Sequence, residues 1–207
     1  MNYRCFVLGP IETNSFVINS DNGAAALVDP VELSTGMIDY ISREKLSIKA
    51  VLITHSHVDH IHAAGEAASR FKAPLYMHSG AEKLRSFYRE SCDRLGFARN
   101  EMPPDYLPAD RAAPLLLGTH EIRFITTPGH SPCGISLLAD TFVITGDLLF
   151  QGDIGRYDLP FSSLPVLYNS LKKIKALDPS LAVLPGHGPL TTLAEELEHN
   201  EYLRKLP

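Results

Sequence analysis

The sequence has 207 residues, of which 44% are hydrophobic and 21% are charged, and these proportions are typical of a globular protein. The formal net charge is −5 and the basic residues are scattered, which argues against nucleic acid as a partner. No stretch approaches the roughly 18 apolar residues of a membrane span, and the N-terminus lacks the apolar core of a signal peptide. Cys5, Cys92 and Cys133 show no paired spacing, which favours reduced thiols. We therefore expect one cytoplasmic domain over residues 1–207 that buries a substantial core.

The first part of the chain is expected to form an antiparallel meander. Asp21-Asn22-Gly23, between two short β-rich runs, is a hairpin turn signal. The third run ends in Asp29-Pro30, where a carboxylate either orients metal-binding histidines from outside or begins a turn. The expected strands cover residues 3–8, 14–19 and 24–28, and a helix capped by Ser34 or Thr35 covers residues 34–44.

A dense cluster of ligand-type residues follows an apolar run over residues 49–53, which is typical of a buried strand. The cluster is Thr54-His55-Ser56-His57-Val58-Asp59-His60. Because His55 and His57 are two residues apart, both imidazoles leave the same side of an extended backbone and can converge on one ion. Asp59 falls near the start of an Ala-rich helix over roughly residues 59–71, where a carboxylate is favoured. A surface patch of histidines is the alternative, but such a patch rarely combines two spacings with an abutting strand.

The middle of the chain carries fewer signals of function. A short strand over residues 74–77 leads into a helix over residues 81–95, and His78 at their junction reads as a capping or surface residue. Residues 96–114 contain four prolines and show the period of neither a strand nor a helix. We expect a long ordered loop there that serves as a lid, as a wall of a binding site or as an oligomer contact.

The second half of the chain repeats one pattern, in which a strand is followed by a glycine-containing turn and then by a ligand-type residue. The three instances follow strands over residues 121–127, 141–145 and 181–184, and they end in His130, Asp147 and His187. Each instance alone is more typical of a turn than of a metal site. Together with the first cluster, however, they supply enough ligands for two ions. A strand over residues 134–138 and helices over residues 162–177 and 192–206 complete the expected elements.

These motifs resemble those of the metallo-β-lactamase superfamily and, within it, of the glyoxalase II-like (hydroxyacylglutathione hydrolase-like) proteins. The resemblance spans almost the whole chain in the family's order. The matching segments are Thr54-His55-Ser56-His57-Val58-Asp59-His60, Thr127-Pro128-Gly129-His130-Ser131, Thr145-Gly146-Asp147, Gly155-Arg156 and Pro185-Gly186-His187-Gly188-Pro189-Leu190-Thr191-Thr192. This resemblance implies an α/β fold, the αββα sandwich, in which two mixed β-sheets are flanked by helices and the metals lie at one edge between the sheets.

By the same resemblance, one divalent ion would be held by His55, His57 and His130. The second ion would be held by Asp59, His60 and His187. Asp147 would bridge the two ions, and Asp59 and Asp147 would be the catalytic carboxylates. Zinc is the expected metal, with iron and manganese as alternatives, because imidazole and carboxylate suit all three.

The resemblance also implies a substrate class. A hydroxide shared by the two metals would attack the carbonyl of a small acyl thioester such as S-lactoylglutathione. Long-type glyoxalase II enzymes carry a C-terminal helical domain that helps to bind glutathione, whereas this chain ends soon after His187, so a short form without that domain is expected. The family often places a basic residue at the position of Arg156, and we expect its planar fork to bind an anionic substrate group. The alternative is a structural arginine paired with Asp153 or Asp158.

Other functions remain open on the same residues. A persulfide dioxygenase-like oxidoreductase would use one iron held by His55, His130 and Asp147. Hydrolysis of another small ester or lactone, of a phosphodiester or of a β-lactam would use both ions. A binding protein with purely structural zinc would need only four closed ligands. The remaining histidines are expected outside the site; they are His62, His78, His120 and His199. The sequence does not define the oligomeric state.

Overall fold

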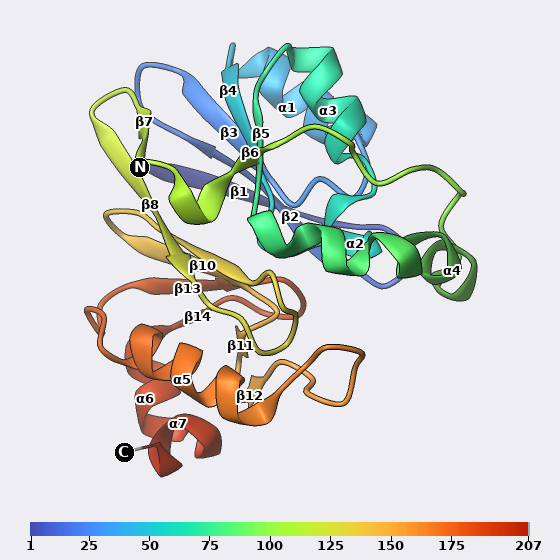
Figure 1. Ribbon diagram of the computed structural model, residues 1–207. Helices are drawn as coiled ribbons and strands as arrows, with labels where there is room; N and C mark the ends of the chain where they lie inside the picture. Colours follow the sequence, from blue (N-terminus) through green and yellow to red (C-terminus); the bar gives the residue numbers. More distant parts are fainter. Residues whose placement is uncertain (207) are drawn as a thin grey trace.

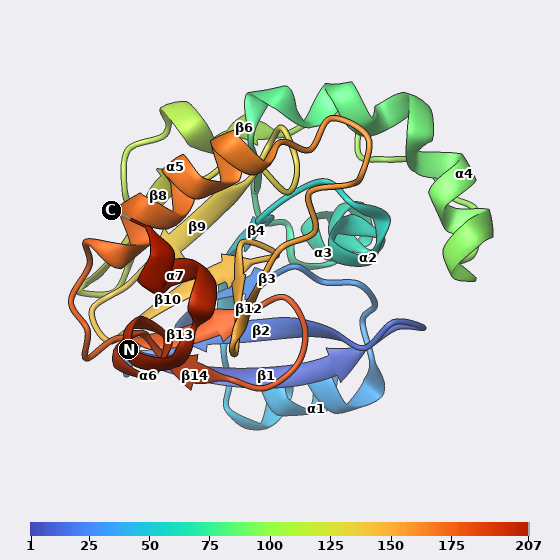
Figure 2. The same ribbon diagram turned by 90° about the horizontal axis from the view of Figure 1, so that it is seen from below.

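The chain forms four layers, with two β-sheets packed face to face and helices on the outer face of each sheet (Figure 1). The structure is a computed structural model, and it describes residues 1–206. Seen from below, α5, α6 and α7 lie over the second sheet (Figure 2). The αββα sandwich that the resemblance implies is therefore confirmed.

The first sheet has the strand order β1-β2-β3-β4-β5-β6, antiparallel up to β3 and parallel from β3 onward. Its strands are β1 (Asn2–Leu8), β2 (Thr13–Asn19), β3 (Ala24–Val28), β4 (Ser47–Leu52), β5 (Leu75–Met77) and β6 (Leu107–Pro108). The helices associated with this half are α1 (Thr35–Arg43), α2 (Val58–Ile61), α3 (Ala64–Phe71) and α4 (Arg85–Leu95), with the 3-10 helices η1 (Ser79–Leu84) and η2 (Ala109–Arg111).

The second sheet has the order β14-β13-β10-β9-β8-β7, in which only β10 and β13 are parallel neighbours. Its strands are β7 (Leu115–Leu117), β8 (His120–Thr126), β9 (Ile135–Leu138), β10 (Phe142–Gly146), β13 (Ala182–Pro185) and β14 (Thr191–Thr192). A separate ribbon pairs β11 (Leu149–Phe150) with β12 (Asp153–Ile154). The helices of this half are α5 (Leu164–Lys175), α6 (Leu193–His199) and α7 (Glu201–Lys205).

The period of two along β4 explains why one strand serves two cores. Val51 belongs to the apolar cluster on the helix side, with Met37 of α1, whereas its neighbour Leu52 belongs to the cluster between the sheets, with Ile144 of β10. Each fully buried side chain of this size contributes roughly 1.5–3 kcal/mol to folding. Because both faces of β4 are covered in its second half, residues 50–52 are a continuous apolar run, whereas Ser47 and Lys49 in its first half are exposed.

The parallel strands place the functional residues at one edge of the sandwich. β3 and β4 run parallel in the first sheet, and β10 and β13 run parallel in the second. The segments that follow these four strands begin the turns that carry Asp29, His55, Asp147 and His187. The ligand-type residues that follow successive strands in the sequence therefore also lie together at this edge of the sandwich.

Two long helices expected from the sequence are interrupted. The helix over residues 59–71 divides into α2 and α3 because the Ala63 amide donates to the Pro30 carbonyl at 3.0 Å, outside any helix. The helix over residues 192–206 divides at Asn200, whose side chain accepts from the Tyr202 and Leu203 amides and begins a new helix.

The expected loop over residues 96–114 is only partly irregular, since it contains β6 and η2. β7, β11, β12 and β14 were also not expected, because strands of two or three residues are too short to show an alternating pattern. No helix among residues 1–206 is long and apolar enough to cross a membrane.

Candidate metal centre

The first group of candidate ligands consists of His55, His57 and His130. One ligand atom from each lies within 4.8 Å of the others. The Nδ1–H of His130 donates to the Arg156 carbonyl at 2.9 Å, so the Nε2 lone pair is turned into the group, 3.0 Å from Nδ1 of His57. The backbone after β12 therefore fixes the tautomer of a histidine that follows β8.

The second group consists of Asp59, His60, Asp147 and His187, again with ligand atoms within 4.8 Å of one another. Nε2 of His60 lies 3.3 Å from an oxygen of Asp59 and 3.3 Å from Oδ1 of Asp147. Oδ2 of Asp147 lies 3.6 Å from Nε2 of His187 and 3.5 Å from Nε2 of His130 in the first group. Asp147 thus lies between the two groups, as a bridging carboxylate must.

Asp29 supports this arrangement from beneath. It is buried, and its Oδ1 accepts from the Thr54 amide at 2.7 Å while its Oδ2 accepts from the Thr54 hydroxyl at 2.5 Å and from Nδ1–H of His60 at 2.8 Å. The proton on Nδ1 leaves Nε2 of His60 free to face the candidate ligands. Of the two interpretations open for this carboxylate, the structure therefore shows the one in which it orients a histidine.

Replacing Asp29 with asparagine should weaken metal binding by about 10- to 100-fold, the usual effect of losing such an outer partner. The amide nitrogen would set a donor against either the Thr54 backbone N–H or Nδ1–H of His60, so either the turn before His55 or the His60 ring would shift. Competition with a chromophoric chelator measures the affinity, and the exposed Asp39→Asn provides the control. Equal affinity in both variants would show that Asp29 serves only the backbone turn.

The turn that carries His187 is held by β2. The side-chain amide of the buried Asn14 donates to the Pro185 carbonyl at 3.0 Å and to the Gly188 carbonyl at 2.9 Å, and its backbone amide donates to the Gly186 carbonyl at 2.7 Å. Nδ1–H of His187 donates to the Ile11 carbonyl at 3.2 Å. The meander at the start of the chain therefore positions a histidine near its end. No spacing in the sequence links Asn14 to this turn, and it was not among the expected site residues.

Four of the candidate ligands, His55, His57, Asp59 and Asp147, have the protonation states that a cation requires. Burial lowers the pKa of His57 to about 4, and burial together with the charge of His60 holds the pKa of His55 well below its usual value. Burial opposes ionisation of Asp59 and Asp147, but His60 outweighs it and holds the pKa of both carboxyls well below their usual range. Burial opposes protonation of His60 and His187, but the neighbouring carboxylates outweigh it and raise the pKa of both rings, so a cation would have to displace their protons.

Three buried polar atoms at this centre have no hydrogen-bond partner among residues 1–206: His55 Nε2, His60 Nε2 and Asp147 Oδ1. A buried polar atom without a partner costs about 1–3 kcal/mol, so three such atoms at one centre call for a ligand of another kind. The donor set of imidazole nitrogens and carboxylate oxygens fits divalent cations of the zinc and iron type. The residues present therefore fit two such ions.

The four histidines left out of the site all lie elsewhere. His62 contacts the Val31 and Ala98 carbonyls, and His78 caps η1 by accepting from the Gly80 amide at 2.8 Å. His120 pairs with Asp140, and His199 lies near Glu195 and Glu198.

Arg156 lies on the cavity wall, but its guanidinium forms two hydrogen bonds of 2.9 Å with the Asp158 carboxylate. The structure thus shows the ion pair that the alternative interpretation described. A substrate anion would have to compete with Asp158 for this fork.

A cavity of about 630 Å³ adjoins the two groups, a size that suits a small organic ligand. It reaches His57, Asp59, His130, Asp147 and His187 at its inner end. Its outer walls come from α4 and from the segment after β12, and none of its lining residues belongs to the segment 96–114. Of the three roles expected for this segment, the wall of this cavity is therefore not the one that the structure shows, because the segment contacts α4 through Arg85 and Tyr88.

Comparison with known proteins defines the class to which this fold and centre belong. The sequence model of the metallo-beta-lactamase superfamily matches residues 8–187. A probable metallo-hydrolase of Bacillus subtilis, YqgX, is 32% identical over 98% of each chain. The hydroxyacylglutathione hydrolase GloC of Haemophilus influenzae is 29% identical, also over 98% of each chain. The chain belongs to the metallo-β-lactamase superfamily.

Solved structures agree with this assignment. A di-iron-bound form of TTHA1623 has a TM-score of 0.86 and 31% identity, covering 97% of this chain and 100% of that one. The B3 metallo-beta-lactamase BLEG-1 has a TM-score of 0.84 and 33% identity, covering 98% and 99%. ETHE1 from Myxococcus xanthus has a TM-score of 0.75 and 26% identity, covering 97% and 84%. These names span several activities, so the glyoxalase II-like subfamily stays a prediction.

Proposed function

We propose that the protein is a metal-dependent hydrolase of small acyl thioesters and that its two groups of ligands hold two divalent ions. The observation that carries this proposal is the position of Asp147, which contacts His60 and His187 of one group and His130 of the other. When bound, such ions activate water at neutral pH and polarise a carbonyl oxygen. A thiolate leaves without a strong general acid, which suits a centre made of metal ligands alone.

The likeness to GloC, a hydroxyacylglutathione hydrolase, supports the thioester as substrate. The cavity supports a small molecule over a polymer, because it is closed on two sides by α4 and by the segment after β12. Zinc is the proposed metal, with iron as the alternative that the di-iron form of TTHA1623 favours. In the dioxygenase alternative a single iron would bind His55, His130 and Asp147, so Asp59, His60 and His187 would coordinate no ion. This disfavours that alternative.

The test is a count of metal ions in protein purified without added metal, paired with a thiol-release assay on S-lactoylglutathione. We expect about two ions per chain, because two separate groups of ligands are present. Removal of the ions with a chelator should abolish thiol release, and adding zinc or iron back should restore it. One ion per chain, or hydrolysis that survives chelation, would overturn the proposal.

Arg156 is the proposed contact for an anionic group of the substrate. Arg156→Ala should lower kcat/KM for an anionic thioester by about 10-fold, near 1.4 kcal/mol. The loss is no larger because the substrate must compete with Asp158 for the guanidinium. Asp158→Asn is the matched variant, since it frees the guanidinium and should raise kcat/KM for the same substrate. A neutral thioester should respond to neither change. Equal losses on both substrates would instead mean that Arg156 supports the loop whose carbonyl orients His130.

A further inference from the structure

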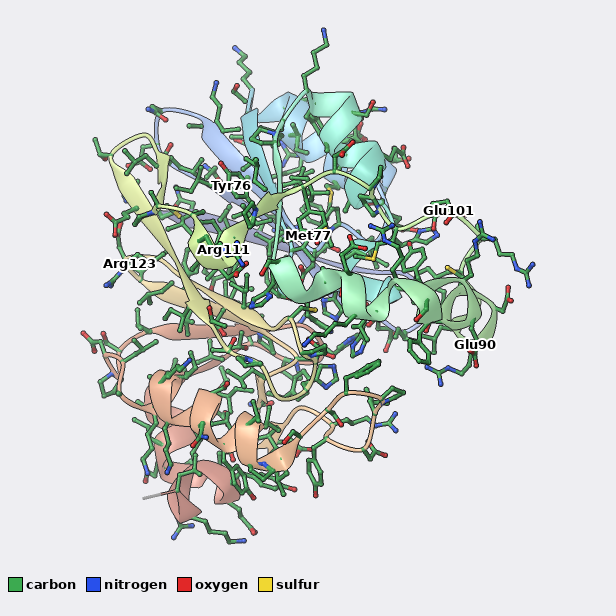
Figure 3. All side chains as sticks on the ribbon, viewed as in Figure 1. Tyr76, Met77, Glu90, Glu101, Arg111 and Arg123 are labelled. Carbon is green, nitrogen blue, oxygen red and sulfur yellow. The ribbon has the colours of Figure 1, made fainter. Side chains whose placement is uncertain are left out.

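One face of α4 forms the outer wall of the cavity. The lining residues recur at intervals of three and four, as expected for one side of a helix. They are Leu84 at the end of η1 and, in α4, Phe87, Tyr88, Ser91, Arg94 and Leu95, with Glu90 beside them. In Figure 3, Glu90 is labelled on α4, away from the two sheets. The wall is therefore a helix surface far from the proposed metals.

The opposite wall consists mainly of apolar residues of the second half, among them Phe150, Leu159 and Pro160. The ring of Phe87 packs edge-on against Phe161 with centroids 5.7 Å apart, which joins the two walls. A substrate with its carbonyl at the metal ligands must therefore extend between these walls toward α4. The far end of the substrate then contacts the polar side chains of α4 that line the cavity.

Two charged side chains of this wall have no partner among residues 1–206. Glu90 and Arg94 both line the cavity, and neither forms an ion pair or a side-chain hydrogen bond with a described residue. They lie one helical turn apart on the same side of α4. The remaining charged wall residue, Arg156, is paired with Asp158, so it is not free in the way that Glu90 and Arg94 are. The free charges are thus one carboxylate and one guanidinium.

This balance of charge separates two classes of thioester. A thiol that carries several phosphates needs several unpaired cations, and Glu90 would repel it. A thiol that ends in an α-amino acid presents one ammonium and one carboxylate on the same carbon, which match Glu90 and Arg94. Arg94 offers a planar fork suited to a carboxylate.

We infer that Glu90 and Arg94 form a specificity site for the zwitterionic amino-acid end of a peptide-type thiol. This inference rests on the proposed thioester hydrolysis, since it names the leaving group of that reaction. It assigns recognition of the far end of the substrate to α4, in addition to the segment that carries Arg156.

Hydrogen bonds to the following segment hold α4 in place, as a site that discriminates between substrates requires. The Arg85 guanidinium of α4 donates to the Met102 and Pro103 carbonyls at 2.8 and 2.9 Å, and the Tyr88 hydroxyl donates to Asn100 at 2.8 Å. Segment 96–106 therefore buttresses α4 from behind, which fixes the spacing of the two charged residues relative to the metal ligands.

The test compares Arg94→Gln and Glu90→Gln on three thioesters of one acyl group. The thiols are glutathione, N-acetylated glutathione, which lacks the ammonium, and N-acetylcysteamine, which is neutral. Arg94→Gln should lower kcat/KM about 10-fold for both glutathione esters, mainly through KM, and leave the N-acetylcysteamine ester unchanged. Glu90→Gln should lower kcat/KM about 5-fold for free glutathione only. Arg89→Gln, on the same helix but outside the cavity and paired with Glu101, is the control.

Binding of S-hexylglutathione, an unreactive thioether, is measured by calorimetry in parallel on the same proteins. Hydrolysis of all three esters with no dependence on Glu90 or Arg94 would overturn the inference and leave the proposed function standing. If the unmodified protein hydrolyses no thioester, the proposed function fails. Calorimetry then decides the inference: tight binding that is lost in Arg94→Gln and Glu90→Gln supports the site, and equal or absent binding in all proteins refutes it.

Discussion

Asp147→Ala should abolish hydrolysis, with a fall in kcat/KM of about 1,000-fold or more, because this carboxylate is placed to serve both ions. The Asp147 carboxylate lies between the two groups, 3.3 Å from His60 and 3.5 Å from His130. Its removal also leaves the buried rings without the negative charge that lies between them. Metal content should fall from about two ions per chain to one or none, as measured by elemental analysis.

Asp147→Asn keeps the shape of the side chain and removes only its charge, so it covers the case in which the alanine variant does not fold. The exposed Asp140→Ala is the control, because that carboxylate pairs with His120 far from the metal ligands. Two ions and full activity in Asp147→Asn would show that the bridge has been assigned to the wrong residue.

Gly186→Ala should be nearly as damaging, although it removes no functional group. A Cβ at this position would lie 2.2 Å from Oδ1 of Asp147 and 2.7 Å from Cε1 of His60. Such contacts are far inside van der Waals distance, so the turn or the ligands must move by more than 1 Å. We expect about a 100-fold loss of activity and loss of the ion on the His187 side, read from metal content and from the rate of thiol release.

Gly188→Ala in the same turn separates crowding from backbone strain. Gly188 has φ of +72° and open space around its Cα, so alanine there should cost about 1–2 kcal/mol of stability through strain alone. Metal content and kcat should stay near those of the unmodified protein. If both glycine variants lose metal equally, crowding at Gly186 is not the cause.

The sequence was sufficient to predict the strands and the ligands that follow them, because both depend on local pattern. Residues 50–53, at the end of β4 and directly after it, are apolar on both faces of the strand. His55 and His57 follow and alternate with other residues. The ends of parallel strands meet at one edge of a sheet, so ligands after β10 and β13 gather there without further specification.

Contacts between residues distant in the sequence could not be predicted in the same way. Asn14 holds the turn around Gly186 through three hydrogen bonds that cross most of the chain, and no motif indicates such a bond. The role of the proline-rich stretch after α4 was also left open from the sequence, with a lid, a binding wall and an oligomer contact as alternatives, and none of its residues lines the cavity. Several of its hydrogen bonds instead join it to α4, through Arg85 and Tyr88.

The distribution of the candidate ligands over both sheets has a consequence for the lifetime of the protein. Each group draws residues from both halves of the chain, so a bound ion fastens the two sheets at their shared edge. An ion that binds only the folded state also raises the free energy of unfolding in proportion to the logarithm of its concentration. Protein made under metal starvation would open more often at this edge and would be degraded sooner. The amount of enzyme in the cell would then follow the supply of metal without any dedicated regulator.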